Sequence, residues 1–220
     1  TMVWPEWVGM NSKEARRYLT IIQKAGLSIP ALQSILFGRP ELKVFKNKVC
    51  QQALLDHLEK VFKIADVLGV GVLVFGSPKN RDRGNLTEEE AFTQAIPLFR
   101  SAGQMANASG TWLCIEPNPP HYGSNFITRW NDALRLVREV DTPGFGLHLD
   151  TGCIFMNDDD PAEAVRACAG MMKHLHISEP NLSDFSSPAV PHEKVASALA
   201  EIDYDGWLSI EMRCGTSPLE

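Results

Sequence analysis

Two short stretches decide the predicted fold: FGLHLD at residues 145–150 and HLHIS at residues 174–178. In each of them apolar and polar residues alternate. Side chains alternate across a β-strand, so residues two apart share a face. The polar residues that share a face are His148 and Asp150 in the first stretch and His174, His176 and Ser178 in the second. The leucines between them face the other way, as expected for strands that pack under helices.

Four further apolar runs have the length of strands, at residues 27–35, 70–75, 111–116 and 207–212. In the last two of these runs, Leu113, Ile115, Leu208 and Ile210 are likewise expected to face outward, toward helices. Stretches with helical spacing or helix-start signals separate the six runs, at residues 12–25, 47–68, 87–108, 128–140, 161–172 and 193–202. This alternation indicates parallel strands joined by helical crossovers. A closed (β/α)8 TIM barrel and an open doubly wound sheet both fit it. The barrel is favoured because polar residues end four different strands, and barrel active sites are built at those ends.

The strand count is two short of a closed barrel. Before the first recognised strand the sequence contains a loop with tryptophans, then a helical segment. We therefore expect residues 1–220 to be a single barrel domain that lacks its first two strands in this chain. An open sheet that is natural for the protein is the alternative.

The composition is typical of a globular protein. The 220 residues carry a formal net charge of −6, and no apolar run reaches the ~20 residues of a membrane span. The basic residues do not cluster strongly, which argues weakly against nucleic-acid binding. The five cysteines have no Cys-x-x-Cys spacing, and the N-terminus has no signal-peptide pattern. We expect free thiols, a cytoplasmic location and no membrane partner.

The strand ends supply a candidate metal site, formed by Glu116, Asp150, His176 and Glu211. Three carboxylates converging in a closed space would repel one another, and burying them as ions is costly. One divalent cation resolves both problems. Three oxygen ligands and one imidazole suit Mn²⁺, Mg²⁺ or Co²⁺ better than a structural zinc cage, although Zn²⁺ is also compatible. Any single acid at a strand end could instead cap a helix or form an ion pair.

Four segments around these residues resemble the xylose isomerase-like TIM barrel superfamily: LCIEPN (113–118), LDTG (149–152), HLHI (174–177) and LSIEMR (208–213). That superfamily includes sugar phosphate isomerases and epimerases, ketose 3-epimerases, inosose dehydratases and the endonuclease IV type of AP endonuclease family 2. The resemblance implies one metal ion on the four residues above and, in the epimerase branch, Glu116 and Glu211 as the acid/base pair. It also implies a homo-oligomer. Cys153 stands where family members commonly carry a histidine that binds substrate.

Further residues on or beside the polar strand ends are candidate substrate contacts: His148, Arg213, Gln33, Trp7 and Glu179. His148 is either a substrate donor or a buried core histidine. Glu179 is either a substrate contact or an exposed loop acid. The loop at residues 77–83, with Lys79, Arg81 and Arg83, either receives a phosphate or carboxylate or is solvated.

Together these features predict a metal-dependent isomerase or epimerase of a sugar or sugar phosphate, active in carbohydrate metabolism. One glutamate would remove a carbon-bound proton next to a carbonyl, giving an enediolate, and the other would return a proton. Return to the opposite face gives epimerisation, and return to the neighbouring carbon gives isomerisation. A dehydratase is a close variant. The alternative functions are an endonuclease IV-like nuclease, which needs more metal ligands than the four found here, and a non-catalytic metal- or sugar-binding barrel.

Overall fold

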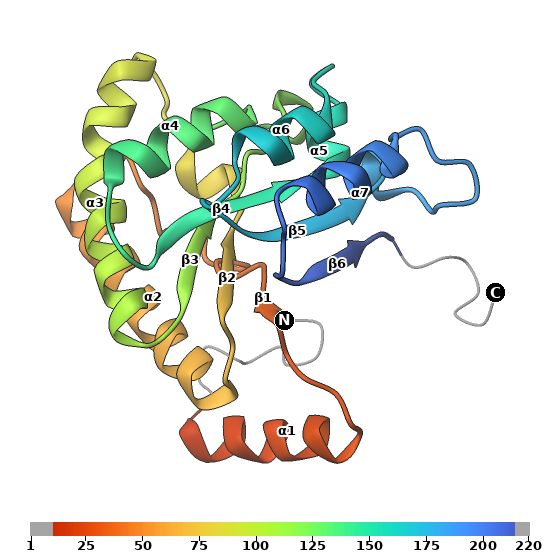
Figure 1. Ribbon diagram of the computed structural model, residues 1–220. Helices are drawn as coiled ribbons and strands as arrows, with labels where there is room; N and C mark the ends of the chain where they lie inside the picture. Colours follow the sequence, from red (N-terminus) through yellow and green to blue (C-terminus); the bar gives the residue numbers. More distant parts are fainter. Residues whose placement is uncertain (1–10, 214–220) are drawn as a thin grey trace.

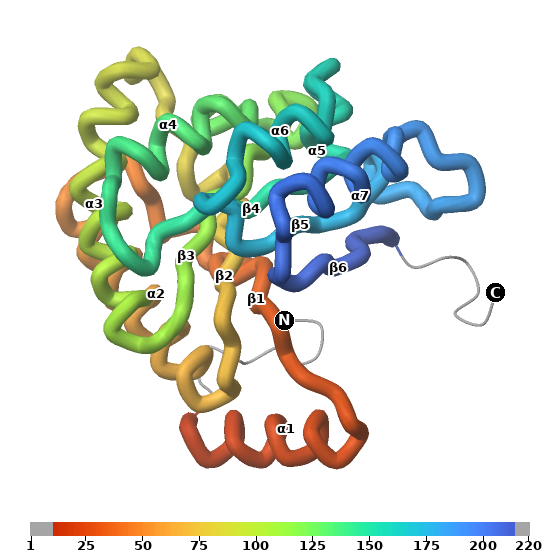
Figure 2. Tube along the Cα trace, in the orientation of Figure 1, coloured from red at the N-terminus to blue at the C-terminus, as the bar shows by residue number. Residues whose placement is uncertain are grey.

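The computed structural model describes residues 11–213 and contains one six-stranded parallel sheet (Figure 1). The strands follow one another in the order β1-β2-β3-β4-β5-β6, and every neighbouring pair is parallel. They are β1 (Ala31–Leu32), β2 (Val72–Phe75), β3 (Trp112–Ile115), β4 (Phe145–Asp150), β5 (Met172–Ser178) and β6 (Leu208–Glu211). The sheet curls, and its helices cover the outside (Figure 2). The predicted six-stranded partial barrel is confirmed.

The helices form largely where the sequence predicts them. They are α1 (Ser12–Lys24), α2 (Lys48–Leu68), α3 (Glu88–Ala108), α4 (Trp130–Val140), α5 (Thr151–Phe155), α6 (Pro161–Ala167) and α7 (His192–Glu201). Thr87 forms a capping box with Glu90 ahead of α3. Helix α6 ends at Ala167, earlier than predicted, because the chain turns at Gly170 (φ +80°) and Met172 already begins β5. Among the described residues, no helix is both long enough and apolar enough to cross a bilayer.

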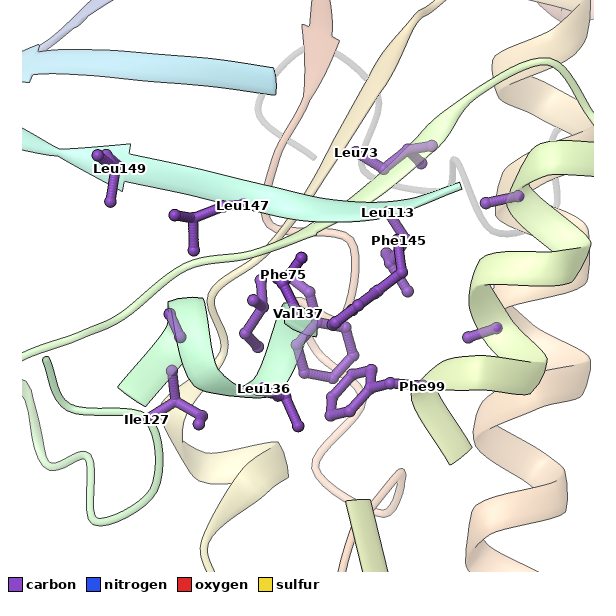
Figure 3. Close-up of a cluster of buried hydrophobic side chains, with 14 of the residues drawn as sticks. Leu73, Phe75, Phe99, Leu113, Ile127, Leu136, Val137, Phe145, Leu147 and Leu149 are labelled. Carbon is purple, nitrogen blue, oxygen red and sulfur yellow. The ribbon is translucent and has the colours of Figure 1, made fainter. Parts of the chain in front are cut away.

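The core lies between the sheet and its outer helices (Figure 3). The Phe99 ring, on α3, lies 5.3 Å from the ring of Phe75 on β2 and 5.1 Å from that of Phe145 on β4. The apolar residues predicted to face the helices from β3, β4 and β5 are fully buried at Leu113, Ile115, Leu147, Leu149 and Leu175. Their polar neighbours therefore face the inside of the curled sheet.

The outer face of β6 departs from this pattern. Leu208 and Ile210 point away from the interior as predicted, but they are 47% and 70% exposed. Helix α7 packs against α6 instead of over β6, and none of the described helices makes more than sparse contact with this edge strand. The expectation that helices cover both residues is therefore wrong for this part of the chain.

Candidate metal and substrate site

Four side chains from four consecutive strands meet at one end of the sheet. Asp150 is directly opposite His176 in the β4–β5 register, and Glu211 is opposite Ser178 in the β5–β6 register. One ligand atom from each of the four predicted metal ligands lies within 4.8 Å of the others. The strand alignment thus brings together residues that are up to 95 positions apart in the sequence.

The imidazole of His176 is central to this group. Its Nδ1 atom lies 3.1 Å from Glu211 Oε2 and 3.7 Å from Asp150 Oδ2. The same atom is 4.0 Å from Glu116 Oε1. All three carboxylates therefore face one nitrogen.

Two atoms of the group are left without hydrogen bonds. His176 Nδ1 and Asp150 Oδ2 are buried, and neither has a hydrogen-bond partner in the described structure. Leaving a buried polar atom unpaired costs about 1–3 kcal/mol, so most such atoms are satisfied by some partner. The two atoms face each other across a few ångströms, where a divalent cation would satisfy both. The residue set therefore fits a metal ion with mixed oxygen and nitrogen ligands.

Asp150 is held so that only one of its carboxylate oxygens, Oδ2, faces the candidate metal position. Its Oδ1 atom accepts hydrogen bonds from the backbone N–H of Cys153 and from the hydroxyl of Ser178, both at 2.7 Å. Burial alone would raise the pKa of Asp150, but the nearby His176 imidazole and the hydrogen bonds from Cys153 and Ser178 outweigh it and lower the pKa. Asp150 thus caps the short helix α5 and remains a carboxylate.

Glu116 is held in place by Asn118 and by the buried guanidinium of Arg81. Its Oε2 atom accepts a hydrogen bond from Asn118 Nδ2 at 3.1 Å. The fully buried guanidinium of Arg81 donates to the Asn118 side-chain oxygen and to the Glu116 backbone oxygen, both at 2.7 Å. Burial lowers the pKa of Arg81 to about 10, so the group stays charged at neutral pH. The hypothesis of a solvated or phosphate-receiving loop is therefore wrong for Arg81, which supports Glu116 and Asn118 instead.

Gly76, directly after β2, leaves the space that Glu116 occupies. A Cβ atom at this position would lie 2.3 Å from Glu116 Oε2. We expect Gly76→Ala to displace the Glu116 carboxylate and to cost about 1–3 kcal/mol of folding free energy through overpacking. Calorimetric metal titration and thermal unfolding would measure both effects. Gly71→Ala is the matched control, because a Cβ there meets nothing within 4 Å. Equal metal affinity in the two variants would contradict this role of Gly76.

Glu211 is held more loosely than Glu116. The side chain of Glu211 is 27% exposed, against 12% for Glu116. Its Oε1 atom accepts a hydrogen bond from Gln33 Nε2 at 3.1 Å. Gln33 directly follows β1, so this bond joins the two edge strands of the curled sheet across the interior (Figure 2).

A pocket of about 660 Å³ opens beside the four residues. Its walls come mainly from the segments after β1, β2 and β3, and they include the aromatic rings of Phe37 and Tyr122. Three residues of the lining adopt left-handed backbone conformations without being glycine: Ser34 (φ 56°), Ser77 (φ 36°) and Leu182 (φ 57°). Such conformations typically cost about 1–3 kcal/mol each, and they concentrate at functional sites.

The predicted substrate contacts divide into two groups. Gln33 lines the pocket, whereas His148, Glu179 and Arg213 are not part of its lining, and Trp7 lies outside the described residues. His148 is fully buried and hydrogen-bonded to His174, so it does not reach a substrate from this position.

Glu179 is buried as well, with 1% of its surface exposed, so the expectation of an exposed loop acid is wrong. Its Oε2 accepts hydrogen bonds from the backbone N–H groups of Ala189 and Val190, and its Oε1 pairs with His192 Nε2 at 2.5 Å. The carboxylate therefore fixes the loop after β5 and is not available to a substrate. Arg213 is exposed, and its backbone N–H donates to the Leu182 oxygen.

Sequence reasoning missed three residues of the site: Gly76, Asn118 and Ser178 as a support of Asp150. Asn118 had a readable signal, because it follows Glu116 by two residues at the end of a strand. Cys153, where the family commonly has histidine, lines the pocket. Burial raises the pKa of its thiol, so Cys153 is a neutral thiol at the pocket wall.

Sequence comparisons find a family model and curated proteins that are similar to this chain. The family model described as "Xylose isomerase-like TIM barrel" matches residues 3–220. D-psicose 3-epimerase of Ruminiclostridium cellulolyticum is 23% identical over 156 residues, which are 71% of this chain and 53% of that protein. The chain thus spans about half the length of this curated relative.

Solved structures show the same fold at low sequence identity. A crystal structure of D-psicose 3-epimerase in the presence of D-fructose superposes with a TM-score of 0.81 at 15% identity, covering 96% of this chain and 73% of that chain. A crystal structure of an AP endonuclease of family 2 from Brucella melitensis superposes with a TM-score of 0.75 at 17% identity, covering 90% and 77%. The fold alone therefore does not separate the two activities.

Proposed function

The chain belongs to the xylose isomerase-like TIM barrel family, and we propose that it is a divalent metal-dependent isomerase or epimerase of a sugar, free or phosphorylated. The reaction is proton transfer at a carbon next to the sugar carbonyl. Glu116, Asp150, His176 and Glu211 hold the metal ion, and Glu116 and Glu211 transfer the protons. A sugar 3-epimerase among the relatives supports this class of substrate.

One observation carries the proposal: of the four ligands, only Glu116 and Glu211 line the pocket. Asp150 and His176 are 1% and 4% exposed and lie behind them. The two residues that reach a substrate are therefore both carboxylates, and carboxylates are suited to general acid and base chemistry. They come from β3 and β6, which β4 and β5 separate in the sheet.

The chemistry follows from these positions. A divalent ion at the site would supply Lewis-acid stabilisation of the negative charge that develops on the substrate oxygen. Burial opposes ionisation of Glu116, but the nearby imidazoles of His148 and His176 outweigh it and lower the pKa of Glu116. Glu116 is thus a carboxylate at neutral pH and can accept a carbon-bound proton. Gln33 donates a hydrogen bond to Glu211, which exchanges the second proton.

Metal stoichiometry and proton exchange test this proposal together. Calorimetric titration of metal-stripped protein with Mn²⁺ or Co²⁺ is expected to give one ion per chain. The loaded protein is then incubated in D₂O with a panel of ketoses and ketose phosphates, and NMR reports deuterium incorporation and product identity. Two or three bound ions would favour the nuclease. The absence of metal binding, or of exchange with every sugar, would contradict an isomerase or epimerase.

Metal binding is expected to release about one proton per chain at pH 7. Burial alone would lower the pKa of His176, but the carboxylates of Asp150 and Glu211 outweigh it and raise the pKa to about 10. His176 is therefore protonated at pH 7 without metal, and a metal ion requires the neutral imidazole. The apparent metal affinity should rise by roughly tenfold per pH unit between pH 6 and 9, because one proton competes with the ion.

Calorimetric titrations in buffers with different heats of ionisation measure this proton release directly. His121→Gln is a suitable control, because His121 is exposed on the loop after β3 and is not among the ligands. An affinity that does not change with pH would show that His176 is neutral in the metal-free protein or does not bind the ion.

A further inference from the structure

A second group of polar side chains lies inside the curled sheet, behind Glu116. His148 and His174 are 0% and 1% exposed, and their Nδ1 atoms lie 3.1 Å apart. His174 Nε2 lies 2.9 Å from the hydroxyl oxygen of Ser209 on β6. At the other end, His148 Nε2 faces Glu116 Oε1 at 3.5 Å, longer than an ordinary hydrogen bond, and has no nearer partner in the described structure.

The short distance between the two Nδ1 atoms restricts their protonation. Only one of these atoms can carry a hydrogen, because two N–H groups would point at each other. Both imidazoles are almost completely buried, at 0% and 1% exposure, and burial disfavours the charged form of an imidazole. Both rings are therefore neutral, and each has one N–H donor and one lone pair.

The carboxylate of Glu116 sets the direction of the hydrogen bonds between these side chains. A carboxylate only accepts hydrogen bonds, and a lone pair on His148 Nε2 would be repelled by it, so His148 Nε2 carries the hydrogen. The Nδ1 atom of the neutral His148 must accept, and His174 Nδ1 must donate to it. His174 Nε2 is left as an acceptor, and the Ser209 hydroxyl donates to it.

A metal ion on the histidines is the competing interpretation. His148, His174 and His176 also have ligand atoms within 4.8 Å of one another. However, His176 already directs its Nδ1 at three carboxylates, and the 3.1 Å contact between His148 and His174 is a hydrogen-bond distance. Two ligand nitrogens that share a proton cannot both bind an ion.

We propose that Ser209, His174 and His148 form a one-way hydrogen-bond relay that positions the carboxylate of Glu116. The relay acts on Glu116 Oε1, whereas Asn118 holds Oε2. Glu116 is thus fixed from two sides, whereas Glu211 has one side-chain donor among the described residues, Gln33, besides its contact with His176. The three relay residues are positioning residues, and their effect on turnover rests on the proposed function.

The tautomers of the two histidines test the relay without any turnover. In ¹⁵N NMR spectra of histidine-labelled, metal-stripped protein, His148 is expected as the Nε2–H tautomer and His174 as the Nδ1–H tautomer. The Nδ1–H form is the minor one of free neutral imidazole, so its presence at His174 is a specific signature. The reverse pair of tautomers would overturn the proposal. Displacement of the proton between His148 and His174 by added Zn²⁺ would overturn it in favour of a metal site.

Substitutions of Ser209 test the consequence for Glu116. Ser209→Ala removes the first donor, and we expect it to shift His174 toward the Nε2–H tautomer and to lower kcat by roughly tenfold, as loss of an outer partner of a ligand commonly does. KM should change by less than about twofold, and Ser209→Thr, which keeps a hydroxyl, should restore kcat. Ser197→Ala is the matched control, because Ser197 is exposed on α7 and its hydroxyl donates to the backbone oxygen of Glu193.

The two proposals fail in distinguishable ways. If no sugar is turned over but the tautomers are as expected, the relay stands and the proposed activity is wrong. If Ser209→Ala leaves the His174 tautomer and kcat unchanged, the relay is wrong and the proposed activity is unaffected.

Discussion

Glu116→Gln and Glu211→Gln are each expected to lower turnover by roughly 10²–10⁴-fold, the usual contribution of a positioned acid or base. Both residues line the pocket, and the structure offers no other acid in that lining to replace them. Glutamine has the shape of glutamate and keeps an oxygen that can face the metal, but it neither accepts nor donates the transferred proton. The fold should be preserved, because neither carboxylate is part of the apolar core.

The measurement is the rate of deuterium incorporation into the substrate at saturating metal, together with thermal unfolding. Glu201→Gln is the matched control: its carboxylate pairs only with Arg166 on the surface. If both glutamate variants lose exchange, each residue is needed for proton transfer. A rate near that of the unchanged protein in either variant would show that the residue binds metal or substrate without moving a proton.

Asp150→Asn is expected to weaken metal binding by at least about 100-fold, the upper end of what loss of a hydrogen-bond partner of a metal ligand costs. Asp150 is 1% exposed, and its Oδ1 is occupied by Cys153 and Ser178 while its Oδ2 has no partner. Asparagine can keep the cap on α5 with one oxygen. It then places an uncharged amide group where the free carboxylate oxygen was, which removes a ligand and a negative charge.

Calorimetric titration with Mn²⁺ or Co²⁺ measures the loss. Asp160→Asn is a close control, because Asp160 also caps a helix, accepting from the Ala162 N–H at the start of α6, and is not among the four ligands. An unchanged affinity in Asp150→Asn would remove Asp150 from the ligand set and leave its helix cap as its role.

The order of the strands and the direction in which most strand residues point could both be predicted from the amino-acid sequence. Alternation within a strand is a local property, so FGLHLD and HLHIS already place Asp150 and His176 on one face. The parallel alternation of strands and helices then brings the strand ends together. The outer face of β6 was the exception, since coverage by a helix depends on where that helix packs and not on the strand's own pattern.

The role of each polar group became visible only in the three-dimensional fold, because hydrogen-bond partners far apart in the sequence leave no periodic signal. The bond from Gln33 to Glu211 joins residues 178 positions apart. The sequence allows a solvated loop cation at Arg81, whereas in the structure Arg81 is buried and donates to Asn118. The sequence allows an exposed loop acid at Glu179, whereas in the structure Glu179 is buried and accepts from the backbone of its own loop. The sequence left open whether His148 is a substrate donor or a buried core histidine, and the structure buries it against His174. The sequence places such groups on a face, and three-dimensional packing selects the atoms that each of them meets.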